Sequence, residues 1–157
     1  MAKMTESDIE VMAIEHLQGL GYEYVYGPDI EPSGINPLRS YQQVILEDKV
    51  RTALQRINPH LSEQKCEEAL KQVMQISSPD LMANNLTFHR ILTEGINIEV
   101  SKDGNTQGEL ASLIDFNDPT NNAFLVINQL TIKEGNHTRR PDLILFINGL
   151  QIGRAHV

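Results

Sequence analysis

Cysteine is almost absent from this sequence, because Cys66 is the only one. A single cysteine excludes a disulfide or a cysteine-based zinc site within the chain, and it indicates reducing surroundings. The sequence also shows no signal peptide and no apolar run near the roughly 18 residues that a membrane span requires. We therefore expect a cytoplasmic protein that has no membrane partner.

Basic residues are also scarce. Thirteen lysines and arginines stand against 21 aspartates and glutamates, which gives a formal net charge of −8. This balance argues against a surface covered with phosphate-binding groups, although a local basic patch is compatible with it. Lys133, Arg139 and Arg140 are candidates for such a patch. The sequence contains no internal repeat and no Gly-x-x-x-x-Gly-Lys-Ser/Thr loop, so it lacks a P-loop ATP site.

The chain is otherwise of ordinary globular composition, with 157 residues of which 40% are hydrophobic and 22% charged. This length suits one domain with a proper core. Helical spacing of apolar residues predicts four helices, near 5–20, 40–57, 62–76 and 79–93. After Gly95 the period changes to two and predicts strands near 96–101, 109–116, 123–132 and 142–147. We expect an α+β (mixed α/β) fold, with N-terminal helices packed on a central mixed, largely antiparallel sheet.

Local signals support several of these elements. Thr5 and Asp8 are spaced as a capping box, and so are Ser40 and Gln43. Ser62 begins the third pattern, and Ser78-Pro79 the fourth. Residues 28–37 contain three prolines and are expected to form a loop. The apolar spacing makes Ile9, Met12, Ala13, Leu17 and Leu20 the expected inner face of the first helix. It makes Cys66 a core thiol and His89 a structural histidine.

The most informative stretch is 139–149. Asp142 directly precedes five apolar residues, and Asn148-Gly149, a strong hairpin signal, follows them. Pro141 cannot donate to a sheet ladder, so the strand is expected to begin at or just after it. Asp142 therefore lies at a strand entrance. A carboxylate there is either a turn residue that accepts local backbone hydrogen bonds or a metal ligand.

A resemblance to a known family decides between these alternatives. It is carried by motifs in order over about residues 4 to 150: Thr-Glu-Ser-Asp at 5–8, Leu-Gly-Tyr at 20–22, Ala-Leu at 53–54, Ile-Asn-Pro at 57–59, Asn-Asn at 84–85, Phe-His at 88–89, Ile-Asp-Phe at 114–116, Asn-Ala-Phe-Leu-Val at 122–126, Asn-Gln at 128–129, Arg-Pro-Asp at 140–142 and Asn-Gly-Leu at 148–150. The sequence resembles the N-terminal nuclease domain of the R (restriction) subunit of type I restriction enzymes.

That family belongs to the PD-(D/E)xK nucleases, in which an aspartate at a strand entrance and a Glu-x-Lys on the next strand form the catalytic centre. Two carboxylates hold Mg²⁺ as a Lewis acid, and the lysine orients or activates water. The resemblance makes Asp142 the first carboxylate, both catalytic and metal-binding. It implies a further metal ligand on the first helix, for which Glu6 is the first choice and Glu10 the second. The basic candidates Lys133, Arg139 and Arg140 would contact DNA.

The sequence departs from the family pattern after Leu150. No Glu-x-Lys follows, and residues 151–157 resemble the translation of a common sequencing-library adapter. We expect residues 1–150 to be a partial restriction-endonuclease-like domain, incomplete at its C-terminal end, and residues 151–157 to be a non-native tail that forms neither strand nor helix. His156 is assigned no metal role. One edge of 142–147 would then be left open or poorly covered, which predicts aggregation.

The resemblance also implies a function. The chain would be the N-terminal part of the R subunit of an ATP-dependent type I site-specific deoxyribonuclease, which cleaves unmodified foreign DNA. Its partners would be double-stranded DNA and the modification and specificity subunits. ATP would bind only in a motor domain absent from this chain, and the fragment itself would be inactive. The alternative is a non-catalytic α+β module that contacts DNA or a partner subunit.

Overall fold

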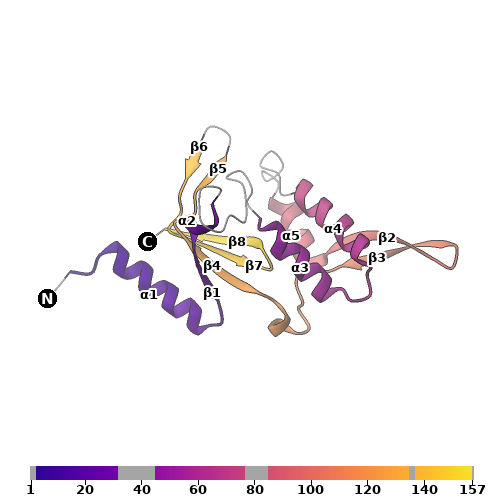
Figure 1. Ribbon diagram of the computed structural model, residues 1–157, viewed down its shortest axis with the longest axis horizontal. Coiled ribbons are helices and arrows are strands. Elements are labelled where there is room, and N and C mark those ends of the chain that lie inside the picture. Colours follow the sequence, from indigo (N-terminus) through magenta and orange to yellow (C-terminus); the bar gives the residue numbers. More distant parts are fainter. Residues whose placement is uncertain (1–2, 32–44, 77–84, 135–136, 157) are drawn as a thin grey trace. The chain divides into compact units, whose positions relative to one another are not determined.

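The computed structural model describes residues 3–31, 45–76, 85–134 and 137–156 (Figure 1). The helices are α1 (Glu6–Gly19), α2 (Gly27–Ile30), α3 (Glu47–Ile57), α4 (Glu63–Ile76), α5 (Asn85–Glu94) and the 3-10 helix η1 (Pro119–Asn121). The strands are β1 (Glu23–Tyr26), β2 (Ile96–Lys102), β3 (Asn105–Ala111), β4 (Phe124–Asn128), β5 (Ile132–Glu134), β6 (His137–Arg139), β7 (Leu143–Ile147) and β8 (Leu150–Ala155). The expected α+β class is confirmed. No helix within the described residues is long and apolar enough to cross a membrane.

The chain forms two compact units. Unit 1 combines residues 1–43 with residues 123–157, and unit 2 is the continuous segment 44–122. Unit 1 therefore depends on pairing between segments far apart in the sequence, whereas unit 2 does not.

A four-stranded sheet in the order β1-β4-β7-β8 forms the centre of unit 1 (Figure 1). The pair β1–β4 is parallel, and the pairs β4–β7 and β7–β8 are antiparallel. The sheet is therefore mixed and largely antiparallel, as expected. β4 and β7 are almost entirely buried, which explains their continuous apolar sequences. Helix α1 joins this core through Ile14, which packs with Val126 and Leu143.

The hairpin between β7 and β8 follows directly from its sequence. Asn148 has φ 53° and Gly149 has φ 82°, the positive values that a two-residue hairpin turn of this type requires. Asn148 is buried and also ties the turn to the start of β4: its backbone N–H donates to the Ala123 carbonyl at 2.8 Å, and its Oδ1 accepts from the Ala123 N–H at 2.8 Å.

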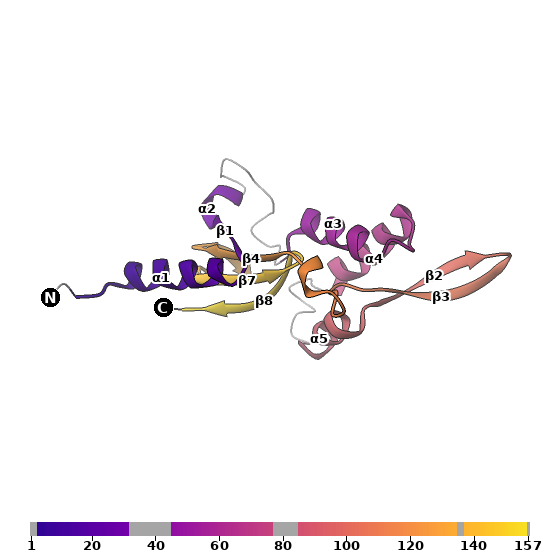
Figure 2. The ribbon, with the colours of Figure 1, turned by 90° about the horizontal axis from the view of Figure 1, so that it is seen from below.

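Unit 2 contains α3, α4, α5 and the long hairpin β2–β3, which projects as a two-stranded ribbon in Figure 2. Its core includes Leu54, Leu70 and the predicted core thiol Cys66, which is confirmed as buried. Burial raises the pKa of that thiol. Asn58, also buried, ends α3: its amide donates to Leu54 O and Ser112 O, and its Oδ1 accepts from the Ser112 N–H.

Several helix predictions are confirmed. Thr5 and Asp8 form the predicted capping box. Ser62 Oγ accepts from the Lys65 N–H at 3.2 Å at the start of α4. The helix predicted at 40–57 begins later than expected, because residues 45 and 46 are described and are not helical, and Leu46 with its extended backbone is the N-cap of α3. The helix predicted at 79–93 is described from Asn85. The expected starts with Ser40, Gln43, Ser78 and Pro79 lie outside the described residues.

Other helix predictions were wrong. Ile9, Met12 and Leu20 are exposed, so the buried face of α1 is narrower than expected and centres on Ile14. His89 is exposed rather than set in an apolar environment. The expected loop 28–37 includes part of the one-turn helix α2, because Pro28 is compatible with a first turn. Its residues 32–37 lie outside the described residues.

Three strand predictions need correction. The strand expected at 109–116 is β3 and ends at Ala111, after which Asp115 accepts local backbone hydrogen bonds that are incompatible with a ladder. The strand expected at 123–132 ends at Asn128, because Gln129 has φ 52°. The tail was expected to have no regular structure, yet β8 covers the edge of β7 with one register irregularity, so the predicted open edge is also wrong.

Candidate functional site

The structure brings together Glu10, Gln129 and Asp142 at one edge of the sheet in unit 1. Gln129 directly follows β4, and Asp142 directly precedes β7. Because β4 and β7 are antiparallel and Asn128 pairs with Leu143, these two neighbours meet at the same end of the pair. Glu10 comes from the middle of α1. Gln129 Nε2 donates to Glu10 Oε1 at 3.0 Å and lies 3.5 Å from Asp142 Oδ1.

The backbone of Gln129 also forms hydrogen bonds at this edge. Its N–H donates to the Asp142 carbonyl at 3.2 Å, and its own carbonyl accepts from Arg140 Nε at 2.9 Å. Its φ of 52° lies in the left-handed region, which is uncommon for residues other than glycine. Such conformations persist where the surrounding contacts impose them, and they cluster at functional sites.

The residues beside Gln129 are fixed by β1 and α2. The Tyr24 hydroxyl donates to Asn128 Oδ1 at 2.9 Å. The pKa of Tyr24 is raised, mainly by burial and in part by the negative charge of Glu10, which places that carboxylate near the tyrosine. Gly27 packs against the same backbone: an added Cβ would lie 2.2 Å from Asn128 O and 2.8 Å from Leu130 N. Only glycine fits there.

The site changes the order of the two first-helix candidates. Glu10, the second choice, is half-buried and joined to Asp142 through Gln129. Glu6, the first choice, is exposed in the first turn of α1. Helical geometry puts Glu10 one turn further along the same helix. The described contacts therefore favour Glu10 as the companion of Asp142.

The predicted basic residues lie close by in the sequence but are only partly described. Lys133 is in β5 and Arg139 in β6, which pair antiparallel, and their side chains lie outside the described part of the structure. Arg140 is exposed, and its guanidinium is bonded to the Gln129 carbonyl. Arg140 is thus the one of the three whose described contacts tie it to the site.

Two residues at this edge were missed by sequence reasoning. His156 was given no role, yet the antiparallel register of β8 places it near the start of β7, with Nδ1 3.9 Å from Asp142 Oδ2. Its side chain is 76% exposed, so this is a loose contact. Gln129 was quoted only as part of the family resemblance. Its place after one apolar run and the place of Asp142 before the next were the signals that could have paired them.

The donor chemistry suits a divalent cation. Mg²⁺ prefers oxygen ligands and is often held by one or two carboxylates together with several waters. Glu10 and Asp142 supply two carboxylates around one polar amide, which fits that preference. Over the described residues, no group of three or more histidine, cysteine, aspartate or glutamate side chains is placed to hold a metal ion. Glu10 and Asp142 would be the side chains that hold such a cation.

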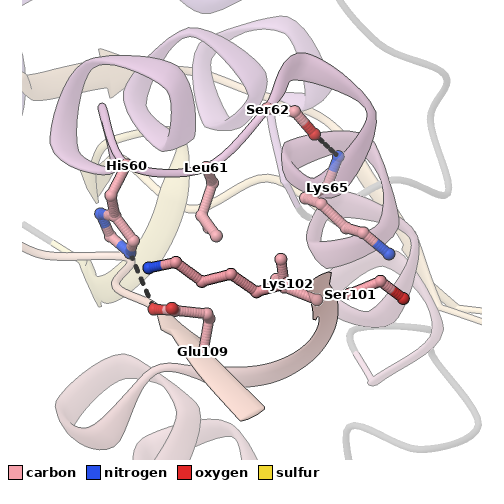
Figure 3. A pocket seen from close by; sticks show the side chains of 8 residues that line it. His60, Leu61, Ser62, Lys65, Ser101, Lys102 and Glu109 are labelled. Carbon is pink, nitrogen blue, oxygen red and sulfur yellow. Dashed lines mark hydrogen bonds and ion pairs between the residues drawn. The ribbon is translucent and has the colours of Figure 1, made fainter. Parts of the chain in front are cut away.

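Pockets in unit 2 offer different chemistry. A pocket of about 490 Å³ is lined by His60, Lys65, Lys102 and Glu109 (Figure 3), among other residues. Lys65 Nζ is paired with Glu68 at 3.2 Å, and His60 lies 3.3 Å from Leu110 O. This pocket includes one carboxylate, so it is not a two-carboxylate site.

A second pocket in unit 2 has a volume of about 370 Å³ and includes Asp115 and Asp118. The Asp115 carboxylate accepts from the Asn117 and Asp118 N–H groups and from Asn121 Nδ2. Asp118 accepts from Thr120. These two acids accept hydrogen bonds within local turns, whereas Glu10 and Asp142 come from segments far apart in the sequence.

The fold and site define an α+β domain with paired carboxylates at a strand entrance of a mixed sheet. The chain matches the family described as "Type I restriction enzyme R protein N terminus" over residues 3–154, and it belongs to that family. It is 36% identical over 155 residues to the "Putative type I restriction enzyme MjaIXP endonuclease subunit" of Methanocaldococcus jannaschii, covering 96% of this chain and 15% of that protein.

The chain is also similar to the "Type I restriction enzyme HindI endonuclease subunit" of Haemophilus influenzae. The identity is 33% over 151 residues, which covers 95% of this chain and 14% of that protein. The chain therefore spans about one seventh of the length of either relative. The predicted family membership is confirmed.

Proposed function

We propose that this chain is the part of a type I restriction endonuclease subunit that carries the first half of a metal-dependent DNA-cleaving site. The observation that supports this proposal is the meeting of Glu10, Gln129 and Asp142 at one edge of the sheet. Both relatives are named as endonuclease subunits of type I restriction enzymes. The parent protein would be a type I site-specific deoxyribonuclease.

Glu10 and Asp142 would hold Mg²⁺, which would supply a Lewis acid and positive charge at the phosphodiester. Asp142 would act from the residue directly before β7, and Glu10 from α1. Arg140, which is bonded to the Gln129 carbonyl, would contact a DNA phosphate, with Lys133 and Arg139 as further candidates.

The further partners and cofactors belong to the same proposal. The substrate would be double-stranded DNA, and the modification and specificity subunits would complete the enzyme. ATP would be used by a motor domain of the parent subunit. The proposed compartment is the cytoplasm.

Cleavage needs more than these two carboxylates. In the PD-(D/E)xK pattern the next strand supplies a glutamate and a lysine, whereas β8 and the two residues after it contain neither. We therefore expect the 157-residue chain itself not to cut DNA. Its net charge of −8 also predicts weak DNA binding that falls quickly with salt.

Substitution of Asp142 in a complete parent enzyme tests the proposal. Asp142→Ala should abolish DNA cleavage and leave ATP hydrolysis and translocation largely unchanged, because the metal site and the motor would be separate. Glu10→Ala should reduce cleavage strongly, and Glu6→Ala, its matched control on the same helix, should not. Loss of ATP hydrolysis together with cleavage would contradict the assignment, and so would a larger effect of Glu6→Ala.

The isolated chain provides a second test. Purified protein is incubated with supercoiled plasmid and Mg²⁺, and we expect no nicking. Metal-dependent nicking that disappears in Asp142→Ala would contradict the expected inactivity and would mean that other residues complete the site.

The absence of a carboxylate and a lysine from β8 also supports a second candidate, a non-catalytic α+β module that contacts DNA or a partner subunit. The genomic sequence beyond Leu150 separates the two. A Glu-x-Lys within about ten to twenty residues, followed by a motor domain, would support the nuclease. A different sequence would support the module.

A further inference from the structure

We propose that Gln129 is a positioning residue that takes the place of the cation in the metal-free site and is displaced when the cation binds. This inference rests on the proposed function, because it assumes that Glu10 and Asp142 hold a divalent ion. It assigns a role to a residue that carries no charge and cannot be found by searching for acidic clusters.

The amide nitrogen of Gln129 lies close to both carboxylates. Gln129 Nε2 lies 3.0 Å from Glu10 Oε1 and 3.5 Å from Asp142 Oδ1. The two carboxylate oxygens therefore lie no further apart than the sum of these distances. Two anionic groups at such a separation repel each other unless positive charge or hydrogen-bond donors lie between them. An amide NH₂ has two N–H groups, one for each carboxylate.

A divalent cation would need the place that the Gln129 amide nitrogen occupies. An ion held by Glu10 and Asp142 would need oxygens of both carboxylates, and Gln129 Nε2 already lies against one oxygen of each. A nitrogen already within hydrogen-bond distance of both oxygens cannot remain there. The N–H donors must leave when the ion enters. The Gln129 side chain would then turn toward the solvent.

Only the side chain of Gln129 would have to move when the cation binds. Its backbone is bonded to Asp142 O and to Arg140 Nε, and its neighbour Asn128 is bonded to Tyr24. These contacts hold the left-handed conformation of the residue from both sides. They involve no atom of the Gln129 side chain. The displaced side chain therefore leaves the rest of the edge in place.

This arrangement predicts that removal of the Gln129 amide strengthens cation binding, whereas removal of a ligand would weaken it. If Gln129 stabilises only the metal-free state, its removal should tighten cation binding while lowering the stability of the metal-free protein. Gln129→Met keeps the length of the side chain and removes both donors. We expect Mg²⁺ and Mn²⁺ to bind Gln129→Met up to about tenfold more tightly, which corresponds to one charge-assisted hydrogen bond. Gln129→Glu should tighten binding further, because it adds a third carboxylate.

The experiment is a cation titration of the 157-residue chain followed by NMR. In the natural sequence the side-chain NH₂ signals of Gln129 and the backbone amide of Asp142 should shift with the same midpoint. The Asp142 amide then reports the midpoint in the Gln129 variants, and thermal unfolding in EDTA reports their metal-free stability. Gln107→Met is the matched control, because Gln107 Nε2 donates to the single carboxylate of Glu109 at 2.9 Å in unit 2. It should leave the midpoint unchanged.

The outcomes separate this inference from the proposed function. Cation binding that is absent, or that survives Asp142→Ala, would overturn the metal site and the role of Gln129 with it. Binding that depends on Asp142 but is unchanged or weaker in Gln129→Met would overturn the role of Gln129 alone. A merely structural glutamine would give that second result in Gln129→Met, even if the carboxylate added in Gln129→Glu tightened binding.

Discussion

The carboxylates of Asp115 in unit 2 and Glu10 in unit 1 have hydrogen-bond partners at very different distances along the sequence. In unit 2 the Asp115 carboxylate accepts hydrogen bonds from Asn117, Asp118 and Asn121, all within six positions of it. In unit 1 Glu10 meets its partner Gln129 across 119 positions of sequence. Local donors fix a turn and use the oxygens for that purpose. In unit 1 a single amide is shared between two carboxylates that are distant in sequence, and under the proposed function a cation would take its place.

The same contrast holds for the architecture. Unit 2 is continuous in sequence, and its helices and hairpin join neighbouring segments. Unit 1 requires α1 and β1 to meet strands that lie about a hundred residues later, and the candidate site forms where they meet. A site of this kind depends on the long-range pairing itself. Changes that disturb that pairing should disturb the site before they disturb unit 2.

The largest expected effect comes from matched core truncations. Phe146, in β7, and Leu70, in α4, are both buried. Phe146→Ala should cost about 3–5 kcal/mol and Leu70→Ala about 2–5 kcal/mol, because each leaves a cavity. Hydrogen exchange should rise mainly in β1, β4, β7 and β8 for the first variant, and mainly in α3, α4 and β2 for the second. Equal changes across both units in each variant would break the comparison.

A smaller loss of stability is expected from substitution of Gly27, with Gly108 as its control. Gly27→Ala places a Cβ 2.2 Å from Asn128 O, and crowding of this kind typically costs about 1–3 kcal/mol. Because the displaced backbone carries Gln129, this variant should also weaken cation binding. Gly108→Ala in β3 is the control: no atom lies within 4 Å of its added Cβ. Urea unfolding and the cation titration measure both. A cation midpoint unchanged in Gly27→Ala would show that this packing does not position the site.

Much of unit 2 and the central strand of unit 1 could be predicted from sequence, because local signals decide them. The capping box at Thr5, the core spacing around Cys66 and the hairpin turn at Asn148-Gly149 each depend on contacts between near neighbours. Asp142 became a site prediction because it precedes an apolar run and lies in a motif of the family resemblance, and the structure places it directly before β7.

The remaining features depend on tertiary contacts. The end of β4 at Asn128 follows from the left-handed Gln129, whose conformation is set by Asp142 and Arg140. The choice between Glu6 and Glu10 depends on how α1 lies against the sheet, which helical spacing alone does not give. Residues 150–155 pair with β7 although their sequence has weak strand character, because β7 offers an unpaired buried edge.

The smallest expected effect is a pH dependence that the two units share. Hydrogen bonds from the Asn121 side chain and from the Asp118 and Asn117 N–H groups lower the pKa of Asp115. The Thr5 N–H and hydroxyl lower the pKa of Asp8 in unit 1. A carboxylate whose pKa is lower in the folded state contributes stability above its unfolded pKa of about 4, and loses that contribution as the pH falls through the folded pKa. Both groups lie at the surface, so salt should weaken the effect.

Asp8→Asn and Asp115→Asn test this expectation. Each variant should be less stable than the natural chain at neutral pH and should approach it at about pH 3, so that its stability changes less with pH. Urea unfolding between about pH 3 and about pH 6 gives the two slopes. Similar flattening in both variants would show that locally bonded carboxylates behave alike in the two units. The distinction would then lie in the distant pair, Glu10 and Asp142. An unchanged slope in either variant would mean that its local hydrogen bonds do not favour the charged form.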